Sequence, residues 1–175
     1  MKIMIIVGMP AAGKNIARRY AESKKIPYFA TGDLVRKEVQ RRGLEPTPEN
    51  TGEVSTELRG ADGMGVTRLV LDEALNSGNE LVFMEGMRSW PEIALIREKA
   101  EGVLAAFIAP RKVRSERITF RGRPDDSPER FEERDMREIA YGTAIPIALA
   151  DEYVLNTGTV GESLKMLEKI VKKYS

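Results

Sequence analysis

The sequence predicts an α/β fold, in which helices cover both faces of a parallel sheet of about five strands. Short apolar runs of strand length recur along the chain, and segments with helical periodicity separate them. Strands that alternate with helices are joined by right-handed crossovers, which leave the strands parallel and buried on both faces. The length of 175 residues fits one domain, so we expect residues 1–175 to form a single unit.

The expected elements follow one another in a regular order. The apolar runs that predict strands are residues 3–7, 26–30, 81–84, 103–109 and 153–155. The amphipathic segments that predict helices are residues 13–24, 66–76, 91–100 and 160–173. Two stretches interrupt this order. Residues 43–65 are rich in proline and glycine, which predicts a mobile insert with a short helix near residues 49–59. Residues 118–127 predict a polar loop before a helix that Ser127 caps and Pro128 begins.

Composition excludes several kinds of chemistry. The chain has no cysteine and no histidine, which rules out disulfides, thiolate catalysis, Cys/His zinc sites and His-based triads. Lys and Arg (28) nearly balance Asp and Glu (27), and the net charge of +1 argues against a nucleic-acid coat. No apolar run approaches the ~20 residues that cross a bilayer, and we expect the short apolar run at the amino end to be a buried strand rather than a secretory signal. We therefore expect a cytoplasmic protein without a membrane partner.

The clearest motif is a glycine-rich loop directly after the first expected strand. It matches G-x-x-x-x-G-K and comprises Gly8, Met9, Pro10, Ala11, Ala12, Gly13, Lys14 and Asn15, with Ile16 following. The backbone N–H groups of such a loop point at a phosphate, and the lysine ammonium reaches the outer phosphates. A serine or threonine usually follows the lysine and binds Mg²⁺, whereas this chain has Asn15. Either Asn15 supplies a carbonyl oxygen, or water and a carboxylate hold the metal.

Two further strand ends carry residues suited to phosphate chemistry. The third strand runs into Glu85-Gly86-Met87-Arg88, where Glu85 can hold Mg²⁺ through water or orient a reacting oxygen, and Arg88 can grip a phosphate. Both side chains have the alternative of simple solvent exposure. After the second strand, Thr31 and Asp33 are also suited to capping a helix. Arg36 follows in that helix and could turn toward the cleft of Arg88, which suggests two anionic substrates.

Arginines gather in the last third of the chain. Residues 111–123 contain six basic residues and one acidic residue. In the helix that follows, Arg130, Arg134, Arg137 and Tyr141 share one face. The acidic residues Glu132, Glu133 and Asp135 could neutralise this helix and leave it a solvated surface. The favoured interpretation is a lid that closes over a phosphate, because a transferring phosphoryl group needs cationic stabilisation.

These segments together resemble the adenylate-kinase-like branch of P-loop nucleotide kinases. The segments that carry the resemblance are residues 8–14, 31–36, 85–88, 123–126 with Arg134, and 150–159. In detail the sequence is most similar to an archaeal family related to adenylate kinase and dephospho-CoA kinase. The resemblance implies a three-layer P-loop NTPase fold with sheet order 2-3-1-4-5, an acceptor-binding insert near residues 34–65 and a lid near residues 118–134. Ala11 stands where the family usually has glycine.

The resemblance also implies an activity, namely transfer of the γ-phosphoryl group of ATP to a nucleotide-like acceptor with Mg²⁺ as cofactor. The implied catalytic residues are Lys14, Arg88, Arg123, Arg134 and Asp33. The implied nucleotide-binding residues are those of the loop through Ile16, together with Arg121, Asn156 and Gly158. The implied acceptor-binding residues are Thr31, Arg36, Glu85, Gly86 and Arg88, and the implied metal ligands are Asn15, Asp33 and Glu85.

Two alternatives stay open. In a dephospho-CoA kinase the acceptor is a ribose hydroxyl, so a base is needed, and Asp33 is the candidate. In a nucleotide-binding regulator there is little turnover, an interpretation that Asn15 and Ala11 motivate. We expect a monomer or a small homo-oligomer and no nucleic-acid partner.

Overall fold

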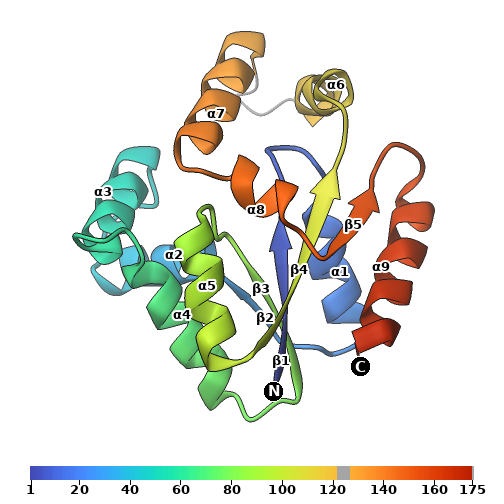
Figure 1. Ribbon diagram of the computed structural model, residues 1–175. Coiled ribbons are helices and arrows are strands. Elements are labelled where there is room, and N and C mark those ends of the chain that lie inside the picture. Colours follow the sequence, from blue (N-terminus) through green and yellow to red (C-terminus); the bar gives the residue numbers. More distant parts are fainter. Residues whose placement is uncertain (122–126, 175) are drawn as a thin grey trace.

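The computed structural model describes residues 1–121 and 127–174, with the side chains of all of these except 119–121 and 128. Its described residues form a five-stranded sheet in the order β2-β3-β1-β4-β5 (Figure 1). Every pairing is parallel. The strands are β1 (Lys2–Val7), β2 (Tyr28–Ala30), β3 (Leu81–Glu85), β4 (Glu101–Ile108) and β5 (Glu152–Leu155). The predicted fold class and strand order are confirmed.

Helices cover both faces of this sheet, because successive residues of a strand point to opposite sides. In β1, Ile3 and Ile5 belong to one apolar core, whereas Met4 and Ile6 belong to another. The core around Met4 is closed by α1 (Asn15–Ser23) and α9 (Val160–Tyr174). The core around Ile3 is closed by α2 (Thr31–Arg41), α3 (Pro48–Arg59), α4 (Gly65–Asn76) and α5 (Trp90–Lys99).

The insert after β2 contains helix, as its sequence predicts. In α3, Thr47 is the N-cap and accepts a hydrogen bond from the Asn50 backbone N–H at 3.1 Å. The start of α2 corrects one expectation, since the N-cap is Ala30, and neither Thr31 nor Asp33 caps the helix. The physical reason is that β2 runs straight into the helix at Ala30, which places Asp33 inside the first turn. There its carboxylate pairs with arginines instead of backbone N–H groups.

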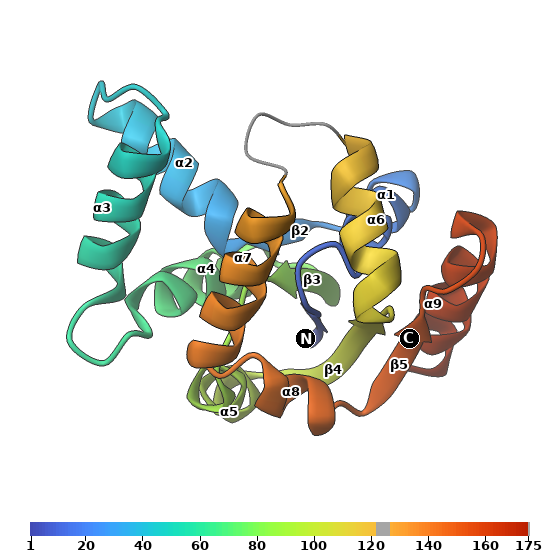
Figure 2. The same cartoon turned by 90° about the horizontal axis from the view of Figure 1, so that it is seen from above.

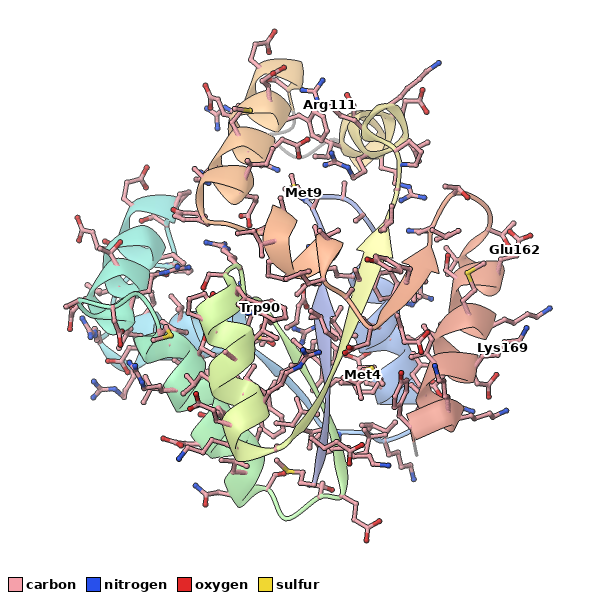
Figure 3. The ribbon with its side chains drawn as sticks, viewed as in Figure 1. Met4, Met9, Trp90, Arg111, Glu162 and Lys169 are labelled. Carbon is pink, nitrogen blue, oxygen red and sulfur yellow. The ribbon has the colours of Figure 1, made fainter. Side chains whose placement is uncertain are left out.

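A third group of helices lies over the carboxyl edge of the sheet. These are α6 (Arg111–Arg121), α7 (Pro128–Ala140) and α8 (Ala144–Ala148). Figure 2 shows α6 and α7 above the sheet, on either side of the loop that follows β1. Figure 3 places Met9 and Arg111 at this edge, while Met4 lies within the sheet.

The segment between α6 and α7 was expected to be a loop from residue 118. The helix instead continues to Arg121, and Ile118 is buried, which anchors the last turn of α6. As predicted, Ser127 caps α7 and accepts a hydrogen bond from the Arg130 N–H at 3.3 Å. The remainder of the expected loop, residues 122–126, lies outside the described residues. Within the described ranges, no helix combines the length and apolarity needed to cross a membrane.

Candidate phosphate-binding site

Two cavities in the described part of the chain meet at the carboxyl edge of the sheet. The larger, of about 660 Å³, we call the loop cavity; it is lined by Ala11, Gly13, Lys14, Asn15, Ile16, Arg19, Glu85, Arg117, Ile118, Asn156, Gly158 and Val160. The smaller, of about 380 Å³, we call the arginine cavity; its charged lining residues are Lys14, Arg18, Arg36, Glu85, Arg88, Arg134, Arg137 and Glu138. Lys14 and Glu85 line both. A molecule in one cavity would therefore lie next to a molecule in the other.

The glycine-rich loop has the backbone that its motif predicts. Gly8 and Gly13 have φ values of +157° and +107°. A Cβ on Gly8 would lie 2.7 Å from the carbonyl oxygen of Phe107, which leaves no room for a side chain. Ala11 has a φ of +59°, a left-handed conformation that costs a residue with a Cβ about 1–2 kcal/mol. The loop therefore keeps a conformation that favours glycine at this position, although alanine occupies it.

Lys14 lies inside the loop, where its Nζ donates to the carbonyl oxygens of Gly8 at 2.7 Å and Met9 at 3.3 Å. Burial lowers the pKa of Lys14 below its usual value, and the carboxylates of Glu85 and Glu138 act in the opposite direction. An ammonium group that has lost water is a strong partner for an anionic oxygen, because the surrounding dielectric is low. The position of Lys14 suits it to bind phosphate.

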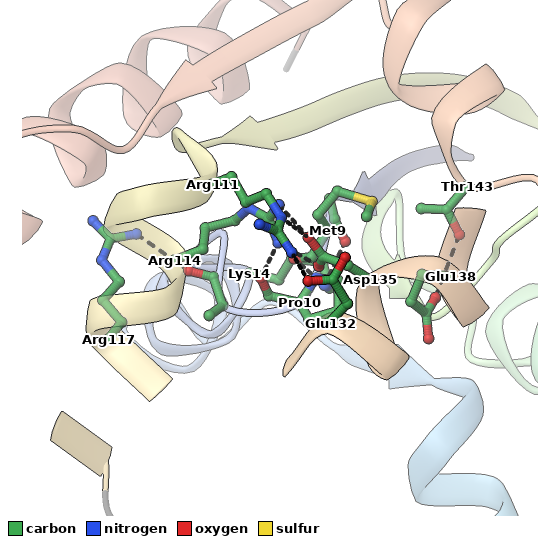
Figure 4. Close-up of polar contacts among 12 residues, drawn as sticks. Met9, Pro10, Lys14, Arg111, Arg114, Arg117, Glu132, Asp135, Glu138 and Thr143 are labelled. Carbon is green, nitrogen blue, oxygen red and sulfur yellow. Dashed lines mark hydrogen bonds and ion pairs between the residues drawn. The ribbon is translucent and has the colours of Figure 1, made fainter. Parts of the chain in front are cut away.

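Two arginines of α6, which the motif analysis did not single out, contact the loop from outside (Figure 4). Arg114 donates to the carbonyl oxygen of Pro10 at 3.0 Å, and Arg117 donates to that of Ala11 at 3.2 Å. Arg114 is buried and also makes two hydrogen bonds, of 2.6 and 2.7 Å, with the buried carboxylate of Asp135 in α7. Asp135 therefore joins α7 to α6 and, through Arg114, to the loop.

Replacing Asp135 with asparagine is expected to lower the free energy of unfolding by about 3 kcal/mol, because it leaves the buried Arg114 guanidinium without its counter-charge. Urea unfolding followed by circular dichroism measures this loss. The control is Glu132→Gln on the same helix, where the ion pair with Arg111 is exposed and contributes little. Equal stabilities of the two variants would contradict the role given to Asp135.

Glu85 is held by a residue that sequence reasoning missed. The hydroxyl of Tyr28, on the neighbouring strand, donates to Glu85 Oε2 at 2.7 Å. Burial raises the pKa of Tyr28, and the Glu85 carboxylate raises it further, so this hydroxyl stays protonated and remains a donor. The carboxylate of Glu85 thus has a fixed orientation at the junction of the two cavities.

Asp33 lies near this junction, but it is not among the described residues that line the two cavities. It accepts a hydrogen bond from Arg18 at 2.7 Å and pairs with Arg36. Burial tends to raise the pKa of Asp33, but the hydrogen bonds from these two arginines outweigh it, and the pKa is lowered. The structure brings Arg36 and Arg18 into the arginine cavity and leaves Asp33 as their counter-ion.

Arg88 meets α7 across the arginine cavity. Its Nε lies 3.2 Å from Glu138 Oε2, and its guanidinium lies over the Tyr141 ring, 4.9 Å from the ring centroid. Thr143 donates to the same Glu138 carboxylate at 3.3 Å. Arg134 lines this cavity as well, so the structure brings it together with Arg88. Arg123 and the side chain of Arg121 lie outside the described part of the chain.

The remaining candidate residues line one or the other of the two cavities. Asn15 is exposed and, like Gly158, lines that cavity. Thr31 and Gly86 lie in the arginine cavity, where Gly86 has a φ of +106° and a Cβ on it would overlap the Thr31 side chain. The described residues contain no cluster of three or more acidic side chains that could hold a metal alone. Mg²⁺ binds few protein oxygens and keeps several waters, so Asn15 and Glu85 on the loop cavity fit such an ion.

The strand order and the glycine-rich loop after β1 together define a P-loop protein with a kinase-like fold. The fold is similar to that of TT1252 from Thermus thermophilus, with a TM-score of 0.67, 19% identity, and coverage of 98% of this chain and 96% of that chain. It is also similar to the shikimate kinase from Acinetobacter baumannii in complex with shikimate, with a TM-score of 0.58, 18% identity and coverage of 98% and 93%. At such identities these likenesses show the fold alone.

The sequence relatives are closer. Residues 7–132 match the family described as AAA domain. The UPF0200 protein of Methanosarcina mazei is 39% identical over 179 residues, which cover 99% of this chain and 96% of that protein. The UPF0200 protein MJ1399 of Methanocaldococcus jannaschii is 38% identical over 178 residues, which cover 99% and 90%. The chain belongs to the UPF0200 family, and the predicted kinship with an archaeal P-loop kinase-like family is confirmed.

Proposed function

We propose that this protein transfers the γ-phosphoryl group of ATP to an acceptor that itself carries phosphate, as a nucleoside monophosphate does. One observation supports this proposal above the others. A cavity against the P-loop meets a second cavity at Lys14, and six cationic side chains but only two carboxylates line that second cavity; they are Lys14, Arg18, Arg36, Arg88, Arg134 and Arg137, with Glu85 and Glu138. Such an excess of cations suits an acceptor with more than one negative charge.

The proposal gives each group of candidate site residues a role in the reaction. The loop amides and Lys14 hold the ATP phosphates in the loop cavity, with Asn156 and Gly158 near the nucleoside. Asn15 and Glu85, which line the loop cavity, would hold Mg²⁺ through water, and the ion would supply positive charge to the phosphates. Arg36 and Arg88 orient the acceptor against Lys14. Arg121, Arg123 and Arg134 close over the moving phosphoryl group and exclude water. We propose that residues 1–175 act as one domain, with an acceptor insert at residues 34–65 and a lid at residues 118–134.

The alternative acceptor, a ribose hydroxyl, has less support. A hydroxyl acceptor needs a base that reaches it, and Asp33 was the candidate. Two arginines engage the Asp33 carboxylate and lower its pKa, so it is a weak base, and it does not line the arginine cavity as described. A phosphate acceptor attacks with an oxygen that is already ionised and needs no base.

An assay of ADP release tests the proposal. Purified protein receives ATP and one acceptor at a time from a panel of nucleoside monophosphates and dephospho-CoA, with and without Mg²⁺. We expect Mg²⁺-dependent turnover with one or more monophosphates and none with dephospho-CoA. Turnover with dephospho-CoA alone would support the hydroxyl acceptor, and tight ATP binding without any product would support a regulator.

Replacing Glu138 with glutamine is expected to lower the KM for the phosphate acceptor about three- to tenfold. Glu138 pairs with Arg88 and adds negative charge to the arginine cavity, so it competes with an anionic acceptor. Glutamine keeps the shape and removes the charge. Steady-state kinetics with the preferred acceptor measure the change, and Glu132→Gln, exposed on the same helix, is the control. An unchanged or raised KM would show that Glu138 is not a competitor.

A further inference from the structure

The carbonyl oxygens of the P-loop are bound by side chains from one end of the loop to the other. Lys14 binds those of Gly8 and Met9, and Arg114 and Arg117 bind the next two. The fifth, of Ala12, accepts a hydrogen bond from Nδ2 of Asn156 at 2.8 Å. We propose that Asn156, oriented by Ser163, is a positioning residue that holds the P-loop in its phosphate-binding conformation. This inference rests on the proposed function, since it concerns how the same loop binds phosphate.

Asn156 is fully engaged on the protein side. It is buried, with 4% of its surface exposed, and it directly follows β5. Its Oδ1 accepts a hydrogen bond from the hydroxyl of Ser163 in α9 at 3.0 Å, and this contact turns Nδ2 toward the loop. Its backbone N–H donates to the backbone carbonyl of Ile108, and its own backbone carbonyl accepts a hydrogen bond from the Arg117 guanidinium at 2.7 Å. Both ends of the amide thus serve the protein rather than a nucleotide base.

The contact with Ala12 determines where the next N–H points. A trans peptide is planar, and its C=O and N–H point in opposite directions. When Asn156 binds the Ala12 carbonyl, the N–H of Gly13 is therefore directed away from Asn156. Gly13 has a φ of +107°, and a Cβ on it would overlap the Asn156 amide. The glycine lets the amide approach the loop, and the amide in turn orients the backbone.

The loop has a specific need for such support. Ala11 lies in the left-handed region, where a residue with a Cβ is disfavoured. The free energy of the loop would therefore fall if Ala11 left this conformation, and the side chains that bind the loop carbonyls prevent this. Arg117 and Asn156 hold the carbonyls on both peptides that follow Ala11. Ser163 is completely buried and lies outside the residues that line the loop cavity. It can act on bound phosphate only through Asn156.

Calorimetric titration with two probes, ATP and inorganic tripolyphosphate, tests this inference. Tripolyphosphate carries the phosphates without a base. We expect Asn156→Ala to weaken the binding of both probes by the same factor, about tenfold, because the Ala12 carbonyl loses a buried hydrogen-bond donor. We expect Ser163→Ala to weaken the binding of both probes about threefold. If Asn156 instead contacted the base, its loss would weaken ATP and leave tripolyphosphate unchanged, and the inference would be overturned.

Two controls separate the possible failures. Asn79→Ala removes an exposed asparagine that also donates to a backbone carbonyl, at the opposite end of the sheet, and is expected to bind both probes normally. Wild-type protein that fails to bind either probe would defeat the proposed function itself. Wild-type binding that Asn156→Ala and Ser163→Ala leave within twofold would defeat only the positioning role. If Asn156→Ala does not fold by circular dichroism, the Ser163→Ala result decides, since it removes a single hydroxyl.

Discussion

Alanine at position 14 is expected to weaken ATP binding at least 100-fold. The Lys14 ammonium lies within the loop, already aligned on the Gly8 and Met9 carbonyls, and it has lost much of its water. Hydrogen bonds between charged groups contribute about 1.5–3 kcal/mol each, and Lys14 can make more than one with a triphosphate. Titration calorimetry with ATP and Mg²⁺ measures the loss directly.

The same substitution is not expected to unfold the protein. Burial lowers the pKa of Lys14, which means that the folded state disfavours its charged form and that the ammonium costs stability near neutral pH. Lys14→Ala should therefore stay folded, because relief of this cost offsets the loss of the hydrogen bonds to the Gly8 and Met9 carbonyls. Lys172→Ala, an exposed lysine in α9, serves as the control for binding. Full ATP affinity in Lys14→Ala would remove the basis for a nucleotide-binding role.

The strands could be predicted from the sequence because the sheet is buried on both faces. Strands such as β1 and β4 then appear as continuous apolar runs, and each one was placed within two residues. The edge strand β2 also falls within two residues of the expected run, which began at residue 26, whereas the strand begins at Tyr28. The strand order did not follow from the runs, since five parallel strands allow several orders, and it came from the resemblance.

The site was predictable only where its signal is local. The P-loop is contiguous, so its residues and its position after β1 could be read directly. The pair of Arg114 with Asp135 spans 21 residues, and that of Tyr28 with Glu85 spans 57. Such pairs leave no periodic pattern in a single sequence, and packing of separate elements alone brings them together. For the same reason the sequence left open whether Asp135 neutralises a solvated helix face, and the structure shows this carboxylate buried.

Alanine at position 88 is expected to lower kcat/KM for phosphoryl transfer about 10³-fold or more, the scale on which a well-placed arginine stabilises such a transition state. Arg88 lines the arginine cavity together with Lys14, and Lys14 lies at the junction through which the phosphoryl group would pass. Because the charge on the transferring group is greatest in the transition state, most of the loss should appear in kcat. Steady-state kinetics with ATP and the preferred monophosphate measure the change.

Arg97→Ala is a closely matched control for this result. The side chain of Arg97 is 31% exposed, against 33% for Arg88, and it also pairs with a carboxylate and lies over an aromatic ring, in this case Asp151 and Trp90. Arg97 is not among the described residues that line the arginine cavity, so Arg97→Ala should leave turnover within twofold of the wild type. Equal rates for Arg88→Ala and Arg97→Ala would show that Arg88 has only a packing role.

A double variant then tests why Glu138 matters. If Glu138 weakens acceptor binding by occupying Arg88, its replacement has no effect once Arg88 is gone, because the two side chains share one interaction. Glu138→Gln should lower the acceptor KM in the wild-type background and leave it unchanged in Arg88→Ala. If the KM falls equally in both backgrounds, Glu138 acts on the field of the whole cavity, through Lys14, Arg134 and Arg137, rather than on Arg88.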